Sequence, residues 1–302
     1  MDRYINCIAH KSSDGNLLIG DKETALVDCG MAFCAAETIQ MVKNALKGRP
    51  LDYIFFTHTH YDHIGALPFF REEWPGLRTV ISALGAAALL KDTPRLVIRE
   101  LSLTASLAYT GSPAGVFSDD VYTSSFQGDI IVEDGGSVSL GDLTVKVLET
   151  PGHTRDSISF FVPELDLLIM NESPGVLMPD GSVMPCFLSS SAGVINSINK
   201  SKQISHRHLS LPHRGYINND EAEGFFDKAL SSNLACRSFI LEMKNRGLSD
   251  GEMLDSFFRQ YSTEELLKYQ PREAFFINAR AMISCVLRED INHQSQTMER
   301  KA

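Results

Sequence analysis

Four side chains that can bind a metal ion fall within residues 56–65, whose sequence is FTHTHYDHIG: His58, His60, Asp62 and His63. In an extended stretch His58 and His60 point to the same side, because side chains alternate with a period of two. Asp62 and His63 follow where the chain must turn, so they can face the same cavity from another direction. Three imidazoles and a carboxylate suit a borderline divalent ion such as Zn²⁺. The whole chain has 9 histidines, so this clustering indicates a metal site rather than a polar loop.

These residues must be positioned by the strands and helices around them. An apolar strand expected at residues 53–56 precedes the cluster directly, and its composition is typical of a strand buried on both faces. Strands are also expected at 4–9, 17–19, 25–27, 79–82, 137–140, 143–148, 157–162, 167–170 and 209–211, and helices at 35–46, 83–90, 94–109 and 193–204. Residues 111–136 are rich in Gly, Ser and Asp and are expected to form a long loop. The order predicts an α/β fold of two β-rich halves with helices packed outside.

From residue 220 onward the pattern becomes helical. We expect helices at 221–234, 236–246, 250–261, 263–268 and 271–287, followed by a frayed polar tail. Ser249 with Glu252 three residues later forms a capping-box pattern, which marks the start of a helix. We therefore predict a catalytic domain over residues 1–220 and a C-terminal helical extension over 221–302, which serves either as a cap over the site or as an interface.

Composition and charge limit the classes of function. Hydrophobic residues make up 43% and charged residues 22% of 302 residues, as in ordinary globular proteins. The net charge of −10 disfavours nucleic acid as a partner. We find no apolar run of the ~18–20 residues that a membrane span needs and no apolar signal-peptide stretch near Met1. The 6 cysteines form no CxxC pair, which indicates reduced thiols in a cytoplasmic protein. The expected partner is a small-molecule substrate, and we expect no association with a membrane. The sequence leaves open whether the chain forms a homo-oligomer.

The motif His58-x-His60-x-Asp62-His63 resembles the signature of the metallo-β-lactamase superfamily of binuclear hydrolases. Other segments agree in the same order. Residues 16–19 and 25–30 resemble the opening strands of the family, residues 150–154 (TPGHT) its third-histidine motif and residues 211–215 (LPHRG) its last motif. The resemblance covers roughly residues 1–220. It implies a four-layer αββα sandwich that holds two metal ions at one edge between two sheets.

The resemblance also implies a set of ligands. His58, His60 and His153 would hold the first metal, and Asp62, His63 and His213 the second. The carboxylate that bridges both ions is usually an Asp in a Gly-Asp pair, whereas this chain has Asn171-Glu172 after the strand at 167–170. We assign Glu172 as the bridge; it could instead bind one ion only, or the second site could be weak.

The same family match leaves two further points open. Zn²⁺ is the expected metal, with Fe or Mn as competitors in this altered, oxygen-rich site. Asp28 matches a family position that generally lies outside the metal ligands, so both a role in fixing a loop and a catalytic role stay open.

Two such ions can lower the pKa of a shared water and polarise the oxygen of a carbonyl or phosphoryl group. We predict a metal-dependent hydrolase that uses a metal-bound hydroxide, with Asp62 as the catalytic residue that orients it. A β-lactamase is disfavoured, since secretion usually goes with that role and no export signal is found. The C-terminal sequence also has no obvious cluster of basic residues for glutathione. A small ester, thioester or lactone is the predicted substrate. The helical C-terminal region and the loop at 111–136 resemble those of the thioesterase-like quorum-sensing members of the superfamily. The alternatives are a phosphodiesterase of the same fold and a non-catalytic metal-binding regulatory protein.

Overall fold

The computed structural model describes residues 3–7, 9–10, 15–113, 124–217, 222, 224–270 and 272–299. The chain forms two compact units that do not follow chain order. The first, here called the sheet unit, consists of Met1–Glu149, Asp156–Asn171 and Ser205–Ala222; the second, the helical unit, consists of Thr150–Arg155, Glu172–Ile204 and Glu223–Ala302. The division into domains at residue 220 stays a prediction. Two segments that precede it in sequence, the short loop Thr150–Arg155 and the longer Glu172–Ile204, belong with the C-terminal helices in the helical unit.

The first sheet of the sheet unit contains six strands in chain order. They are β1 (Tyr4–Asn6), β2 (Asn16–Ile19), β3 (Thr24–Val27), β4 (Tyr53–Phe55), β5 (Arg78–Ser82) and β6 (Ile130–Val132). The first three are antiparallel, whereas β3 to β6 run parallel. A parallel pair needs a crossover connection, and helix α1 (Ala35–Leu46) supplies it between β3 and β4. As a result the carboxyl ends of β3 and β4 lie side by side.

The second sheet has the strand order β14-β13-β10-β9-β8-β7. Its strands are β7 (Ser137–Ser139), β8 (Thr144–Glu149), β9 (Ile158–Val162), β10 (Leu167–Ile169), β13 (His208–Leu211) and β14 (Gly215–Ile217). Only β10 and β13 are parallel among the pairs of this sheet. The sheet therefore brings the carboxyl end of β10 next to that of β13.

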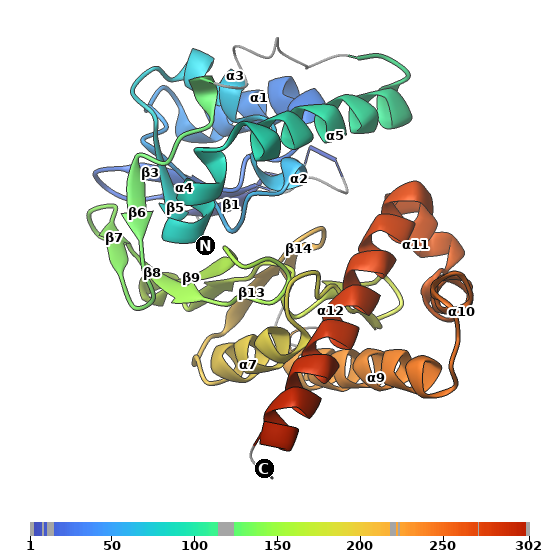
Figure 1. The fold of residues 1–302 in the computed structure, drawn as a ribbon. Helices are drawn as coiled ribbons and strands as arrows, with labels where there is room; N and C mark the ends of the chain where they lie inside the picture. Colours follow the sequence, from blue (N-terminus) through green and yellow to red (C-terminus); the bar gives the residue numbers. More distant parts are fainter. Residues whose placement is uncertain are drawn as a thin grey trace. The chain divides into compact units, whose positions relative to one another are not determined.

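Alternation of side chains along the strands builds the layers of the sheet unit. In β4, Tyr53 and Phe55 belong to a core cluster shared by the two sheets, whereas Ile54 belongs to a cluster between the first sheet and its helices. Phe55 packs edge-on against Phe160 of the second sheet, with ring centroids 5.3 Å apart. Helices α1, α3 (Leu67–Glu73) and α5 (Asp92–Thr110) lie on the other side of the first sheet (Figure 1). Both faces of β4 are therefore buried, as its composition predicts.

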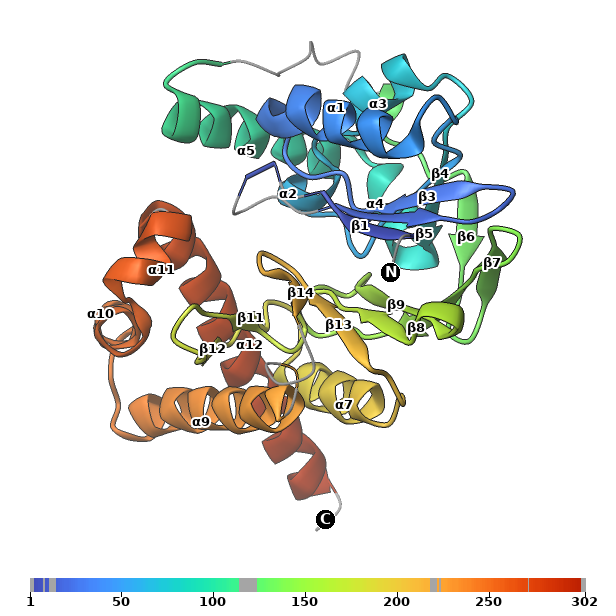
Figure 2. The same cartoon turned by 180° about the vertical axis from the view of Figure 1, so that it is seen from behind.

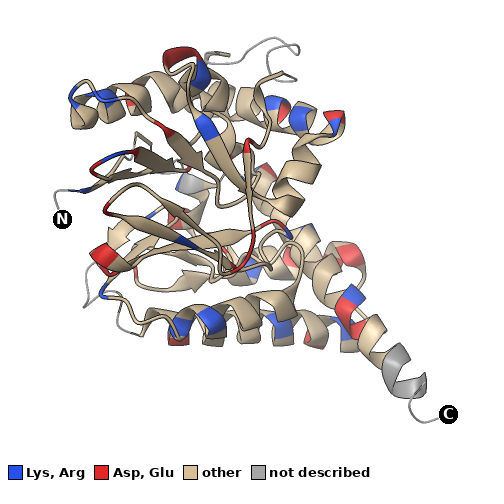
Figure 3. Ribbon diagram, turned by 90° about the vertical axis from the view of Figure 1, so that its left-hand side faces the viewer, with Lys and Arg blue, Asp and Glu red and all other residues tan. Residues whose placement is uncertain are grey.

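The helical unit consists mainly of five helices: α7 (Ser191–Lys202), α9 (Phe225–Asn245), α10 (Asp250–Tyr261), α11 (Glu264–Tyr269) and α12 (Arg272–Glu299) (Figure 2). α9 packs against α7 and α12, and α12 also contacts α7 and α10. A two-stranded hairpin of β11 (Val176–Leu177) and β12 (Val183–Met184) adds to the unit. The capping box of Ser249 and Glu252 is confirmed at the start of α10. Acidic and basic residues are interspersed along the helices (Figure 3).

Several elements differ from the sequence-based expectations. The two helices expected at 221–234 and 236–246 are one helix, α9, because its buried stripe continues through Ala229, Cys236 and Ile240. α12 continues to Glu299, where a frayed tail was expected, and β6 lies within the expected loop at 111–136. The part of that loop at 114–123 lies outside the described residues. Within the described helices, no stretch is long and apolar enough to cross a membrane.

Candidate metal centre

Asp28 follows β3 directly and lies at the same sheet edge as the residues that follow β4. Its backbone N–H donates to the carbonyl of Phe55 at 2.8 Å. Its φ of 58° is left-handed, a conformation that Asp adopts more readily than most other residues. The carboxylate is buried and accepts hydrogen bonds from Thr57 N at 2.9 Å and from Thr57 Oγ1 at 2.7 Å. Asp28 therefore fixes the start of the histidine-rich loop.

The same carboxylate also orients a predicted ligand. Asp28 Oδ2 lies 2.8 Å from His63 Nδ1, and both side chains are buried. When Nδ1–H donates to a carboxylate, Nε2 of the imidazole is left as the nitrogen that can bind a metal. Asp28 therefore acts through His63 and fixes its ring.

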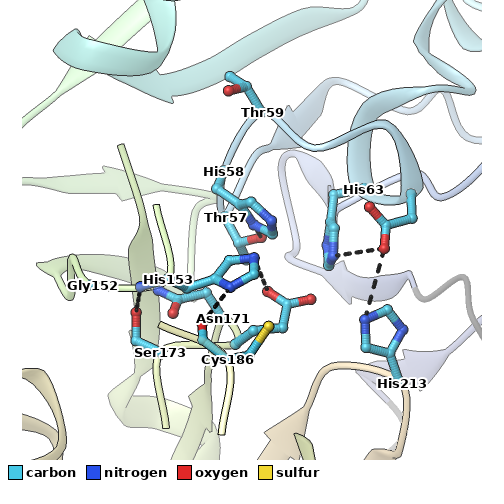
Figure 4. A network of polar contacts seen from close by, with 12 residues as sticks. Thr57, His58, Thr59, His63, Gly152, His153, Asn171, Ser173, Cys186 and His213 are labelled. Atoms are coloured by element: carbon cyan, nitrogen blue, oxygen red, sulfur yellow. Dashed lines mark hydrogen bonds and ion pairs between the residues drawn. The ribbon is translucent and has the colours of Figure 1, made fainter. Parts of the chain in front are cut away.

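Asp62, His63 and His213 come together in the sheet unit. Their ligand atoms lie within 4.8 Å of one another. Nε2 of His63 and Nε2 of His213 each lie 3.9 Å from Asp62 Oδ2 (Figure 4). His213 reaches this place from the turn between β13 and β14, with a left-handed φ of 61°. Two imidazole nitrogens and one carboxylate oxygen are a donor set that fits a divalent ion such as Zn²⁺.

His58 and His60 lie next to this group. The ring centroid of His58 is 4.6 Å from that of His60 and 4.2 Å from that of His63. Thr57 Oγ1 lies 3.0 Å from His58 Nδ1. Because the hydroxyl hydrogen of Thr57 goes to Asp28, its oxygen accepts from Nδ1–H, which leaves Nε2 of His58 as the candidate ligand atom. The sheet unit thus brings together five of the seven predicted ligands.

The helical unit holds the other two. His153 Nε2 lies 3.9 Å from Glu172 Oε2, and both side chains are almost completely buried (Figure 4). His153 Nδ1 donates to the backbone carbonyl of Cys186 at 2.8 Å, so Nε2 is the nitrogen of the ring that can bind a metal. The backbone N–H of His153 donates to Ser173 Oγ at 3.3 Å, and Ser173 Oγ donates to the carbonyl of Thr150 at 2.6 Å. These bonds join the loop that carries His153 to the residue after Glu172.

Sequence reasoning singled out Asp28 without linking it to His63, and it did not find the partners of His58 and His153. The Cys186 carbonyl belongs to the backbone, so no residue type marks it, and Thr57 has no distinguishing pattern apart from its place before His58. The hydroxyl of Tyr216, three residues after His213, contacts His208 Nδ1 at 2.9 Å and thus bonds within the sheet unit. Burial raises the pKa of the thiols of Cys7 and Cys236 to about 12, so neither supplies a thiolate nucleophile at neutral pH.

The sequence pattern of the metallo-β-lactamase superfamily matches residues 15–171, more than half of the chain. The chain belongs to the metallo-β-lactamase superfamily. It is 28% identical over 119 residues to the probable metallo-hydrolase YqgX of Bacillus subtilis, covering 39% of this chain and 47% of that protein. It is 24% identical over 166 residues to a hydroxyacylglutathione hydrolase of Brucella ovis, covering 54% and 48%. The chain thus spans about half the length of these curated relatives.

Solved structures agree on the fold. A metallo-β-lactamase family protein of Thermus thermophilus, TTHA1429, has a TM-score of 0.60 at 18% identity and covers 96% of this chain and 94% of its own. The archaeal superfamily protein ST1585 of Sulfolobus tokodaii has a TM-score of 0.57 at 19% identity, with 76% and 84% covered. The αββα metallo-β-lactamase fold with appended C-terminal helices is confirmed. Membership of this superfamily supports a metallo-hydrolase that binds divalent metal ions. The donor atoms of Asp62, His63 and His213 agree with this, because they could hold such an ion.

Proposed function

We propose that this chain is a binuclear metal-dependent hydrolase that cleaves a small ester, thioester or lactone. His58, His60 and His153 would hold one ion, Asp62, His63 and His213 would hold the other, and Glu172 would be the ligand that both ions share. The observation that carries this proposal is the group of Asp62, His63 and His213, with a buried carboxylate behind His63. Such a carboxylate–imidazole pair is the usual support of a metal-binding histidine.

When bound, divalent ions lower the pKa of water toward neutrality and polarise the oxygen of a carbonyl group. Asp62 orients the attacking water and carries its proton to the leaving group. Its side chain is 20% exposed, so a substrate can reach it, whereas Asp28 is 6% exposed and acts only through His63. Neither step requires a nucleophilic Ser or Cys, in agreement with the raised thiol pKa of Cys7 and Cys236.

Two observations support an acyl substrate of modest charge. Curated relatives include a glyoxylase B2 of Dictyostelium discoideum and the hydroxyacylglutathione hydrolase, whose name denotes removal of an acyl group from glutathione. In the helical unit, three basic side chains pair with acidic neighbours, as Lys202–Asp227, Lys244–Asp290 and Lys268–Glu265. Cations neutralised in this way offer little attraction to a polyanionic substrate. This favours a small acyl ester or thioester over glutathione conjugates and phosphodiesters.

The test combines metal analysis with a substrate panel. The full chain is purified without added metal, and its Zn, Fe and Mn are quantified; we expect two equivalents per chain. The panel contains p-nitrophenyl acyl esters, acyl thioesters, an acyl lactone and bis(p-nitrophenyl) phosphate, each with and without chelator. Chelator-sensitive hydrolysis of an acyl substrate supports the proposal. Turnover of the phosphodiester alone would favour the phosphodiesterase alternative, and two bound ions without any turnover would favour a non-catalytic binding protein.

A further inference from the structure

The N-terminal end of α7 contacts both the loop of His153 and the C-terminal helix α12. We propose that Glu289 on α12 is a positioning residue for the metal ligand His153. This inference rests on the proposed function, because it assigns Glu289 to the support of the first metal site. All of the contacts that carry it lie within the helical unit.

The first step of the argument concerns residues 186–190, which run into α7. Cys186 O accepts from His153 Nδ1 at 2.8 Å, and Leu188 N donates to the carbonyl of His153 at 3.2 Å. Ser189 N and Ser190 N both donate to the carbonyl of Gly152 at 3.1 Å. The segment therefore fixes the ring of His153 and the backbone carbonyls of Gly152 and His153.

The second step concerns α7 itself. Ser197 Oγ donates to the carbonyl of Pro151 at 2.7 Å. Gly152 has a φ of +137°, and a Cβ atom at this position would lie 2.4 Å from Val194 N. The loop backbone is thus pressed directly onto the first two turns of α7. A shift of those turns is expected to move the loop, because the Gly152 site lies directly against the backbone of Val194.

The third step leads to α12. Glu289 Oε1 accepts from Ser190 Oγ at 2.7 Å and from Ala192 N at 3.4 Å, and Glu289 Oε2 accepts from Ser191 Oγ. Ser190 is also the N-cap of α7 and accepts from Gly193 N at 2.9 Å. A carboxylate is favoured at a helix N-terminus by the helix dipole and by the orphan N–H groups. Glu289 therefore ties the same turn that seats the His153 loop to α12.

These contacts form a continuous path from Glu289 through Ser190 to Gly152 and His153. Removal of the carboxylate takes away the acceptor of Ser190 Oγ and Ser191 Oγ, so the first turn of α7 loses its anchor on α12. Metal ligands must be held within about 0.5 Å of their productive positions. Partners one step beyond the ligands typically change metal affinity by about 10- to 100-fold. Because Glu289 acts through α7, we expect the lower end, about tenfold, for the ion that His153 binds.

The experiment compares Glu289→Ala and Glu289→Gln with the wild type as full-length apoprotein titrated with Co²⁺. The matched control is Asp290→Asn, which alters the adjacent carboxylate on α12; Asp290 pairs with Lys244 of α9 at 2.6 Å. We expect Glu289→Ala to weaken one of two Co²⁺ equivalents about tenfold and to change the visible absorption spectrum of that equivalent only. Glu289→Gln keeps one acceptor oxygen and should restore part of the affinity. Asp290→Asn should leave both equivalents unchanged.

Each outcome is decisive. If the wild type binds two equivalents and both Glu289 variants keep both affinities and spectra, the positioning role is overturned while the proposed function stands. If the wild type binds no Co²⁺, the proposed function fails. Melting temperatures separate positioning from general instability: an equal drop in Asp290→Asn without loss of affinity supports a specific role of Glu289. If Glu289→Ala does not fold, the same titration of Glu289→Gln decides.

Discussion

The two groups of candidate ligands differ in what fixes their imidazoles. In the sheet unit, His63 is held by the side chain of Asp28 at the end of a buried strand. In the helical unit, His153 is held by the backbone carbonyl of Cys186, in a loop seated on α7. A carboxylate partner makes the imidazole a stronger ligand than a neutral carbonyl does. The orientation of the imidazole thus depends on one side chain, Asp28, in the sheet unit and on the packing of a loop against helix α7 in the helical unit.

The carboxylates of the two ligand groups, Asp62 and Glu172, differ in how exposed they are. Asp62 is 20% exposed and comes from a short helix, α2 (Tyr61–Ile64), whereas the side chain of Glu172 is 3% exposed. The segment after Glu172 is anchored from α9, because buried Asn233 donates through Nδ2 to the carbonyl of Pro174 at 3.0 Å. An accessible carboxylate exchanges protons with substrate and water more readily than a buried one. The exposures therefore agree with the proposed roles, proton transfer for Asp62 and a shared metal ligand for Glu172.

Removal of the metal should have the largest effect, because both ligand groups act in the proposed mechanism only through the metal ions that they bind. We expect chelation to abolish hydrolysis and added Zn²⁺ to restore it. Metal that is present at about 100 times its Kd stabilises a native protein by about 2.7 kcal/mol, so the apoprotein should also unfold at lower urea. Activity assays and urea titrations of the same samples measure both. Full activity in chelated protein whose metal content is verified as zero would contradict the proposed mechanism.

Asp62→Asn tests the accessible carboxylate. The amide keeps the shape but cannot take up a proton, so we expect kcat to fall by about 10²- to 10⁴-fold. The control is Asp92→Asn, since Asp92 is 79% exposed and pairs with Arg95 of its own helix. Metal content must be measured for both variants. A kcat within twofold of the wild type, with two ions bound, would remove Asp62 from the mechanism.

Gly152→Ala tests the packing of the His153 loop against helix α7. The added Cβ would meet Val194 N at 2.4 Å, and the φ of +137° disfavours any side chain. Overpacking and backbone strain of this kind together cost about 2–4 kcal/mol. Gly48→Ala is the matched control in the sheet unit, because Gly48 has a φ of +92° but nothing within 4 Å of an added Cβ. Urea unfolding should show a clearly larger loss for Gly152→Ala; equal losses would show that the loop has room to move.

Local patterns in the sequence were enough to predict the elements that depend on neighbours in the chain. The expected helix at 35–46 coincides with α1, and the strands around the motif agree within a few residues. The seven ligand positions rest on motifs, and their roles stay predictions. Two features were missed for different reasons. β14 is a strand of three residues, too short for a side-chain period to show, that pairs with β13 across the turn carrying His213. The contact of Glu289 with Ser190 spans 99 residues. Spacing within one helix cannot reveal such partners.

The comparison between the two imidazole supports can be tested directly by Asp28→Asn and Cys186→Ala. The amide at position 28 removes the negative partner of His63 Nδ1, so we expect a loss of about 10- to 100-fold in affinity for the ion that His63 binds. Cys186 supports His153 through its carbonyl, which alanine retains, so Cys186→Ala should leave the affinity for both ions within twofold. Stepwise Zn²⁺ titration against a competing chelator measures both variants. A large effect of Cys186→Ala would mean that its thiol contributes to the site, and an unchanged Asp28→Asn would mean that the ring of His63 is fixed by its backbone alone.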